Sequence, residues 1–233
     1  MQERQRPITV DIWSDFICPW CWIAKRRFEK ALSKFVGSES VAIRYRAFRI
    51  SNNNTAMPFV TELEDKFSSP NSALAMMNQV KRVGEDEGLT YHFEKALFGN
   101  TELAHRLVAC AQKYGFADAI VEQLYSASFN EGRSIFDPDE LTAIAIQAGM
   151  DPEIARHGVS TNTYKKSILA DEFEAIRFGA RSVPLFVLNQ KYVLQGLSSE
   201  QEILAALEQV ETELYSKLRV NDGPVCDLTG CGF

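Results

Sequence analysis

Residues 11–22, DIWSDFICPWCW, decide the fold because they place Cys18 and Cys21 between a strand pattern and a helix pattern. Before them, apolar and polar side chains alternate over residues 8–12, which is the period of a half-buried strand. After them, residues 19–36 have helical apolar spacing. A helix N-terminus presents unpaired N–H groups that stabilise a thiolate, so we expect Cys18 to be the more acidic sulfur. Cys-x-x-Cys in this setting indicates a thioredoxin-like dithiol–disulfide site.

The composition is that of a globular protein of ordinary polarity. Of the 233 residues 45% are apolar, and 25 basic against 31 acidic side chains give a net charge of −6. Because nucleic-acid binding requires basic surfaces, we expect no nucleic-acid partner. A polar N-terminus leads directly into the first strand pattern, and no apolar stretch has the length of a membrane span. We therefore expect a cytoplasmic protein without a membrane partner.

Two segments with α/β patterns flank a long helical region. Residues 41–47 alternate as a second strand, which completes a β-α-β unit by about residue 50. No convincing strand lies between residues 51 and 180, where helical patterns cover residues 71–83, 101–114, 137–148 and 160–178. Strand patterns return at residues 185–188 and 191–194, joined by an Asn189-Gln190 turn, and Ser198 is expected to cap a last helix.

These elements predict one α/β domain that carries a helical insertion. The α/β domain is discontinuous and comprises residues 1–50 and 160–216. The α-helical insertion domain comprises residues 51–159, and residues 217–233 form an extended C-terminal tail.

Four segments carry a family resemblance: Cys18-Pro19-Trp20-Cys21, Asn100-Thr101-Glu102-Leu103-Ala104-His105-Arg106-Leu107, Ser182-Val183-Pro184 and Cys226-x-x-x-x-Cys231. With them the chain resembles the DsbA family of thiol–disulfide oxidoreductases, and within it the FrnE-like branch. The first and third segments are common to the wider thioredoxin fold, whereas the second and fourth together are more specific to this branch. The resemblance implies a thioredoxin-like fold with an inserted helical domain, and disulfide exchange without a bound organic cofactor.

The cysteine pair is the expected catalytic centre. As a thiolate, Cys18 attacks a disulfide sulfur and forms a mixed disulfide, which Cys21 resolves. The resemblance implies that Pro184 has a cis peptide bond and faces the reactive sulfur. A cis bond would direct the Val183 backbone toward a substrate chain, which could then pair as an added strand. We expect Trp20 to be exposed beside the sulfurs and to contact substrate.

Asp15 and His105 are further candidates for the substrate groove. Asp15 lies three residues before Cys18, where it can accept a proton or cap the helix, and general preferences favour the cap. His105 lines the groove in the family pattern, although a lone helical histidine is more often structural. Cys110 follows the spacing of the apolar residues on its helix and is predicted to be a buried small hydrophobic residue.

Cys226 and Cys231 form a second pair in the predicted tail. A disulfide between them would close a small loop, and strained or exposed disulfides are labile. The tail before Cys226 is about ten residues long and, at about 3.3 Å per residue, reaches some 30 Å. We expect an auxiliary redox pair that exchanges with Cys18 and Cys21. The alternative is a terminal disulfide, or an unpaired tail, without a redox role.

Two other functions fit the same residues. A zinc-holding, redox-switched binding protein would use Cys18, Cys21, Cys226 and Cys231 as four thiolate ligands. A glutathione-dependent isomerase of the same fold, such as the hydroxychromene-carboxylate isomerases, lacks the second cysteine of the pair, so Cys21 counts against it. The main prediction is an oxidoreductase whose partners are protein or small-molecule thiols and disulfides, with neither a metal nor an organic cofactor.

Overall fold

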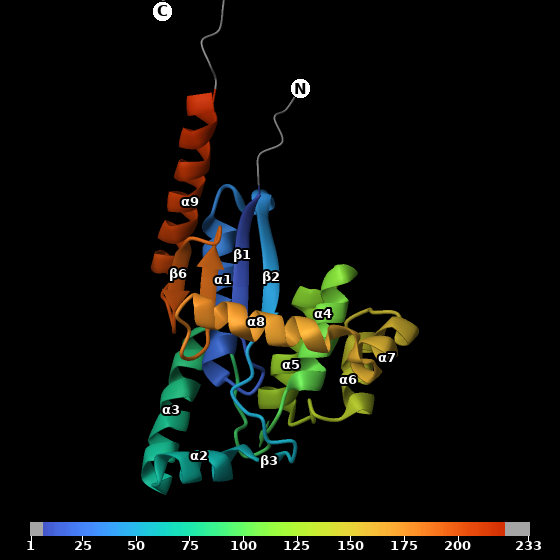
Figure 1. The fold of residues 1–233 in the computed structure, drawn as a ribbon. Coiled ribbons are helices and arrows are strands. Elements are labelled where there is room, and N and C mark those ends of the chain that lie inside the picture. Colours follow the sequence, from blue (N-terminus) through green and yellow to red (C-terminus); the bar gives the residue numbers. More distant parts are fainter. Residues whose placement is uncertain (1–6, 222–233) are drawn as a thin grey trace, which may run out of the picture.

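A four-stranded sheet forms the centre of the structure, a computed structural model that describes residues 7–221. Its strands are ordered β2-β1-β5-β6. They comprise β1 (Ile8–Ser14), β2 (Val41–Ala47), β5 (Leu185–Leu188) and β6 (Tyr192–Gln195). β1 is parallel to β2 and antiparallel to β5, and β6 is antiparallel to β5 (Figure 1). The parallel pair follows from the intervening helix, since parallel neighbours need a crossover connection.

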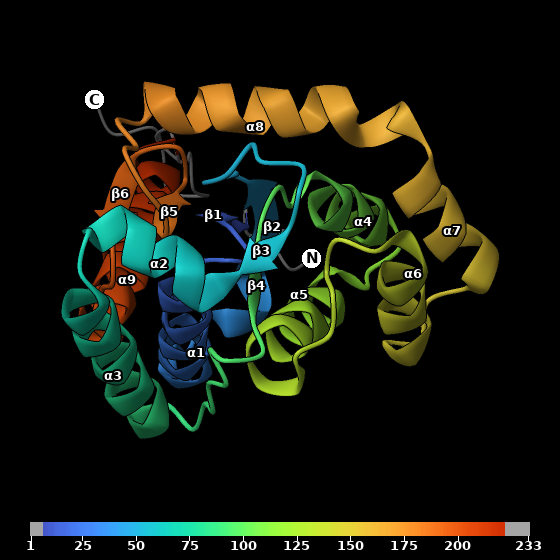
Figure 2. The same cartoon turned by 90° about the horizontal axis from the view of Figure 1, so that it is seen from below.

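Helices cover both faces of this sheet. α1 (Pro19–Lys34) and α9 (Glu200–Asn221) lie on one face, and α8 (Lys165–Arg177) crosses the other (Figure 2). Alternate residues of β1 therefore meet different helices. Val10 belongs to the core formed with α1 and α9. Trp13 faces α8, where its indole nitrogen donates to the Asp171 carbonyl oxygen at 2.7 Å.

The insertion between β2 and α8 is mostly helical. Its helices are α2 (Phe59–Phe67), α3 (Pro70–Asp86), α4 (Glu102–Lys113), α5 (Ala117–Ser126), α6 (Pro138–Gln147) and α7 (Pro152–Ser160). Short helical segments lie at Ser38–Ser40, Ala127–Glu131 and Asn162–Tyr164. Figure 2 shows α3 on one side of α1 and α4 to α7 on the other. One apolar core runs from the cysteine pair into this insertion, so the site and the insertion pack as one unit.

The predicted α/β, thioredoxin-like fold with inserted helices is confirmed. Three details of the prediction were wrong. The insertion contains a two-stranded ladder of β3 (Met57–Pro58) and β4 (Leu97–Phe98), and α2 and α5 were not predicted. α9 continues to Asn221, so the extended tail does not begin at residue 217. The last helix is preceded by a capping box of Ser199 and Glu202, one residue later than expected. Within residues 7–221, none of the helices has the length and hydropathy needed to cross a membrane.

Candidate active site

Cys18 occupies the N-cap position of α1, with extended backbone angles of φ −98° and ψ 106°. Its N–H donates to the Asp15 carbonyl oxygen at 3.1 Å, and the Cys21 N–H donates to the Cys18 carbonyl oxygen at 3.1 Å. Among the described residues, no side chain caps this helix, and its first turn has no acidic residue. A thiolate on Cys18 is therefore the anion best placed to interact with the free N–H groups and the helix dipole.

The loop before β5 lies against this cysteine. The peptide bond between Val183 and Pro184 is cis, as expected. The Cys18 sulfhydryl donates to the Val183 carbonyl oxygen at a sulfur–oxygen distance of 3.7 Å. Residues 165 positions apart thus meet at the Cys18 sulfur. A main-chain carbonyl at this point can also accept from the backbone of an extended substrate.

Cys21 lies deeper than its partner and is only 3% exposed. Burial raises the pKa of the Cys21 thiol well above its ordinary value, and the hydrogen bond and negative charge of Cys18 raise it further. Cys21 is therefore a protonated thiol at neutral pH. It must lose this proton before it can attack a mixed disulfide.

The release of substrate from a Cys18 mixed disulfide should therefore accelerate with pH. Because the Cys21 pKa is raised, the thiolate fraction, and with it the release rate, should rise about tenfold per pH unit from pH 6 to 8. Burial is the largest cause of the raised pKa and, unlike the two smaller causes, does not require a free Cys18 thiol. Single-turnover release of a chromogenic thiol from the pre-formed adduct measures this rate. A flat profile would contradict the burial of Cys21.

Aromatic side chains of the insertion pack on Trp22 of α1 and belong to the same apolar core as the cysteine pair. The Trp22 ring stacks on Tyr125 at 6.1 Å between centroids and meets Tyr91 edge-on at 5.4 Å. Trp22 is buried, whereas Trp20 is half-buried rather than exposed. Tyr91 and Tyr125 were not predicted, because they lie outside any motif and approach the site only through the packing of the insertion.

Comparison with known proteins agrees with this geometry. A model of the DSBA-like thioredoxin domain matches residues 9–208. The chain belongs to this family. A probable DsbA oxidoreductase of Streptomyces coelicolor is 30% identical, with a TM-score of 0.81, and the match covers 97% of this chain and 99% of that one. The DsbA-like family comprises thiol–disulfide oxidoreductases, and this chain carries a Cys-x-x-Cys pair at Cys18 and Cys21.

Two more distant proteins are also similar to this DsbA-like chain. The Bacillus subtilis protein YwbO is 22% identical over 190 residues, which are 80% of this chain and 89% of YwbO. A 2-hydroxychromene-2-carboxylate isomerase shares the fold, with a TM-score of 0.59 and 16% identity. The match covers 92% of this chain and 100% of the isomerase. At that identity the likeness shows the fold alone.

The predicted role of Asp15 as a helix cap or groove residue is wrong. Its carboxylate is fully buried and, among the described residues, accepts no hydrogen bond from the first turn of α1. One carboxylate oxygen accepts from the Ile50 N–H at 2.6 Å, and the other accepts from the Thr101 hydroxyl at 2.7 Å. Asp15 therefore ties the loop after β1 to the loop after β2 and to the start of α4.

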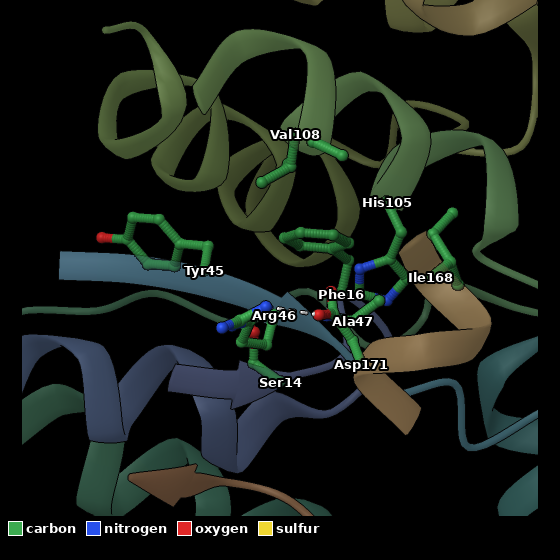
Figure 3. A pocket seen from close by; sticks show the side chains of 10 residues that line it. Ser14, Phe16, Tyr45, Arg46, Ala47, His105, Val108, Ile168 and Asp171 are labelled. Atoms are coloured by element: carbon green, nitrogen blue, oxygen red, sulfur yellow. Dashed lines mark hydrogen bonds and ion pairs between the residues drawn. The ribbon is translucent and has the colours of Figure 1, made fainter. Parts of the chain in front are cut away.

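His105 also lies in the interior of this DsbA-like fold rather than in an open groove. It is 4% exposed, its ring packs on Phe16 at 4.8 Å between centroids, and its Nε2 lies 3.7 Å from an Asp15 carboxylate oxygen. Figure 3 shows it at a pocket that Arg46 and Asp171 also line. The pocket volume of about 10 Å³ leaves room for about one water molecule, so no substrate binds there.

The remaining cysteines divide into one that the structure describes and two that it does not. Cys110 is fully buried on α4, as predicted. Cys226 and Cys231, which are two of the four zinc ligands in the alternative prediction, lie outside the described residues. Within residues 7–221, no group of three or more histidine, cysteine or acidic side chains could hold a metal ion.

Proposed function

We propose that this protein exchanges disulfides with protein substrates through Cys18 and Cys21. The observation that supports this most is the position of Cys18: an uncapped helix N-terminus, 3.7 Å from the Val183 carbonyl that precedes a cis proline. Half-buried Trp20 adjoins the sulfur in sequence and provides an apolar contact for a substrate chain. The substrates proposed are therefore extended polypeptide segments that carry a disulfide or a pair of thiols.

The reaction needs only the two sulfurs of the protein. The Cys18 thiolate attacks one sulfur of a substrate disulfide, the substrate S–S bond breaks, and the other substrate sulfur leaves as a thiolate. The Cys21 thiolate then attacks Cys18 in the mixed disulfide and releases the second substrate sulfur. The protein becomes a disulfide as the substrate gains two electrons. The same steps in reverse oxidise a substrate dithiol.

A redox titration of the Cys18–Cys21 pair together with a disulfide-exchange assay tests this function. We expect catalysed reduction of insulin, or repair of a scrambled disulfide protein, in glutathione buffers. A reduction potential near −270 mV, as in thioredoxin, would indicate a reductase, and a value near −200 mV or above an oxidase or isomerase. A protein that leaves both substrates untouched and has no fast-reacting thiol near neutral pH would contradict the proposal.

We further propose that the chain belongs to the FrnE-like branch and that its tail pair relays electrons. Support comes from the Asn100–Leu107 segment on α4 and from the Cys226 and Cys231 spacing. Because α9 continues to Asn221, only five residues lead to Cys226, or about 17 Å of extended chain. Figure 1 shows that α9 ends beyond the end of the sheet at which β1 begins. Cys18 follows the opposite end of β1. This geometry favours exchange between molecules over exchange within one.

Replacing both Cys226 and Cys231 with serine should then slow turnover by roughly twofold to tenfold, because the Cys18–Cys21 pair loses the second dithiol that passes electrons to it. Steady-state insulin reduction by the full chain measures this effect. Turnover per molecule of the unmodified protein should also rise with protein concentration if exchange occurs between molecules. Unchanged kinetics in the double variant would remove the relay.

A further inference from the structure

Tyr91, in the segment between α3 and β4, hydrogen-bonds the redox motif itself. Its buried hydroxyl donates to the Pro19 carbonyl oxygen at 2.8 Å. Pro19 lies between the two cysteines and is the first residue of α1. Within residues 7–216, no other side chain of the insertion forms a hydrogen bond with the Cys18–Cys21 segment.

The Tyr91 ring is closely enclosed, which holds the hydroxyl at one point. It meets Trp22 edge-on at 5.4 Å, stacks on Phe93 at 5.4 Å and contacts Phe129 at 5.5 Å between centroids. Gly84 of α3 leaves the space that the ring needs, because a Cβ at that position would lie 2.5 Å from the ring carbon Cε2. The insertion therefore positions this hydroxyl against the motif through four neighbours.

The Tyr91 side chain keeps its proton and therefore remains a hydrogen-bond donor. Burial raises the pKa of Tyr91 far above its ordinary value, and negative charge on Cys18 and then on Cys21 raises it further. The side chain is therefore a neutral phenol at neutral pH, and its O–H remains a donor. The positive end of its O–H dipole points into the first turn of α1, next to the sulfurs.

We propose that Tyr91 is a positioning residue for the cysteine pair, and that its hydrogen bond to Pro19 stabilises the dithiol form over the disulfide form. The proposal rests on the proposed disulfide-exchange function. A thiolate interacts favourably with the positive end of the dipole, and the disulfide form has no thiolate. Loss of the hydroxyl thus destabilises the reduced form and makes the pair less oxidising.

The experiment compares full-length Tyr91→Phe with the unmodified protein in glutathione buffers. The equilibrium is protein dithiol plus oxidised glutathione giving protein disulfide plus two reduced glutathione molecules. Alkylation, then mass spectrometry of the peptide that holds Cys18 and Cys21, excludes the tail cysteines. We expect the equilibrium constant to rise about threefold to tenfold, the size of a typical hydrogen bond. By about 30 mV per tenfold, the potential falls about 15–30 mV.

Two further variants make the test specific. Tyr125→Phe is the matched control, because Tyr125 packs on the same Trp22 and, within the described residues, its buried hydroxyl makes no hydrogen bond to the Cys18–Cys21 segment. We expect no shift in that variant. Gly84→Ala displaces the Tyr91 ring without altering its chemistry, and we expect a shift in the same direction as in Tyr91→Phe.

Unfolding of each variant is measured alongside the equilibrium. A Tyr91→Phe variant that unfolds more readily but keeps the glutathione equilibrium would show a purely structural hydroxyl and overturn the proposal. Equal shifts in Tyr91→Phe and Tyr125→Phe would also overturn it, because the hydrogen bond to Pro19 would not be the cause. If the unmodified protein itself failed to exchange with glutathione, the proposed function would fail instead, which is a distinct result.

Discussion

Replacing Cys18 with serine should abolish disulfide exchange, with a loss of turnover of about a thousandfold or more. A serine hydroxyl stays protonated at neutral pH and does not attack a disulfide, whereas the Cys18 sulfur lies at a helix N-terminus that favours a thiolate. The fold should persist, since the sulfhydryl of Cys18 makes only weak hydrogen bonds, to the Val183 carbonyl at 3.7 Å and with the Cys21 thiol. Insulin reduction by the full chain, with thermal unfolding as the check on folding, measures both.

Cys21→Ser is the matched variant for this prediction. It keeps the nucleophile and removes only the sulfur that resolves the adduct. It should therefore accumulate a mixed disulfide between Cys18 and substrate, visible as a reducible adduct of defined mass. An adduct on the Cys18→Ser variant, or rapid multiple turnover by Cys21→Ser, would reverse the assigned roles of the two cysteines.

The parts of the fold that follow local rules could be predicted from the sequence. The β1 strand and the Asn189-Gln190 turn, with φ of 48° and 58°, are fixed by near neighbours, although β1 is buried on both faces rather than half-buried. The helical pattern over residues 137–148 begins with an aspartate, a favoured cap residue, and Asp137 caps α6 by accepting from the Asp139 N–H at 2.8 Å. The cysteine motif also depends on local order alone, since a strand must end and a helix must begin on either side of it.

The long-range contacts around the site could not be predicted from local sequence rules. Asp15 is a favourable cap residue by type and position, but its partners Ile50 and Thr101 are 35 and 86 positions away and turn it into the interior. Tyr91 reaches Pro19 across 72 positions, from a segment without a motif. Such contacts depend on how the insertion packs on α1, and residue spacing along the chain does not contain that information.

Asp15→Ala should destabilise the protein by about 3–5 kcal/mol, because two buried donors lose a charged acceptor. The Ile50 N–H and the Thr101 hydroxyl point at a side chain with no exposed surface, so water does not replace the carboxylate. Unfolding in guanidinium chloride, followed by tryptophan fluorescence, measures the loss. Trp13 and Trp22 are both buried and should report the transition.

Asp15→Asn removes the carboxylate but keeps nearly the same side-chain shape, so it distinguishes the effect of the carboxylate from the effect of the volume. The amide keeps one oxygen for one of the two donors, while its NH₂ group faces the other, so the loss should be smaller, about 1–3 kcal/mol. Thr101→Val removes a single neutral donor and should cost less than Asp15→Ala for the same reason. A loss below 1 kcal/mol for Asp15→Ala would mean that the loops after β1 and β2 are held by their apolar packing alone. The predicted order, with alanine worst, distinguishes a buried anchor from a surface cap, whose removal typically costs about 1 kcal/mol.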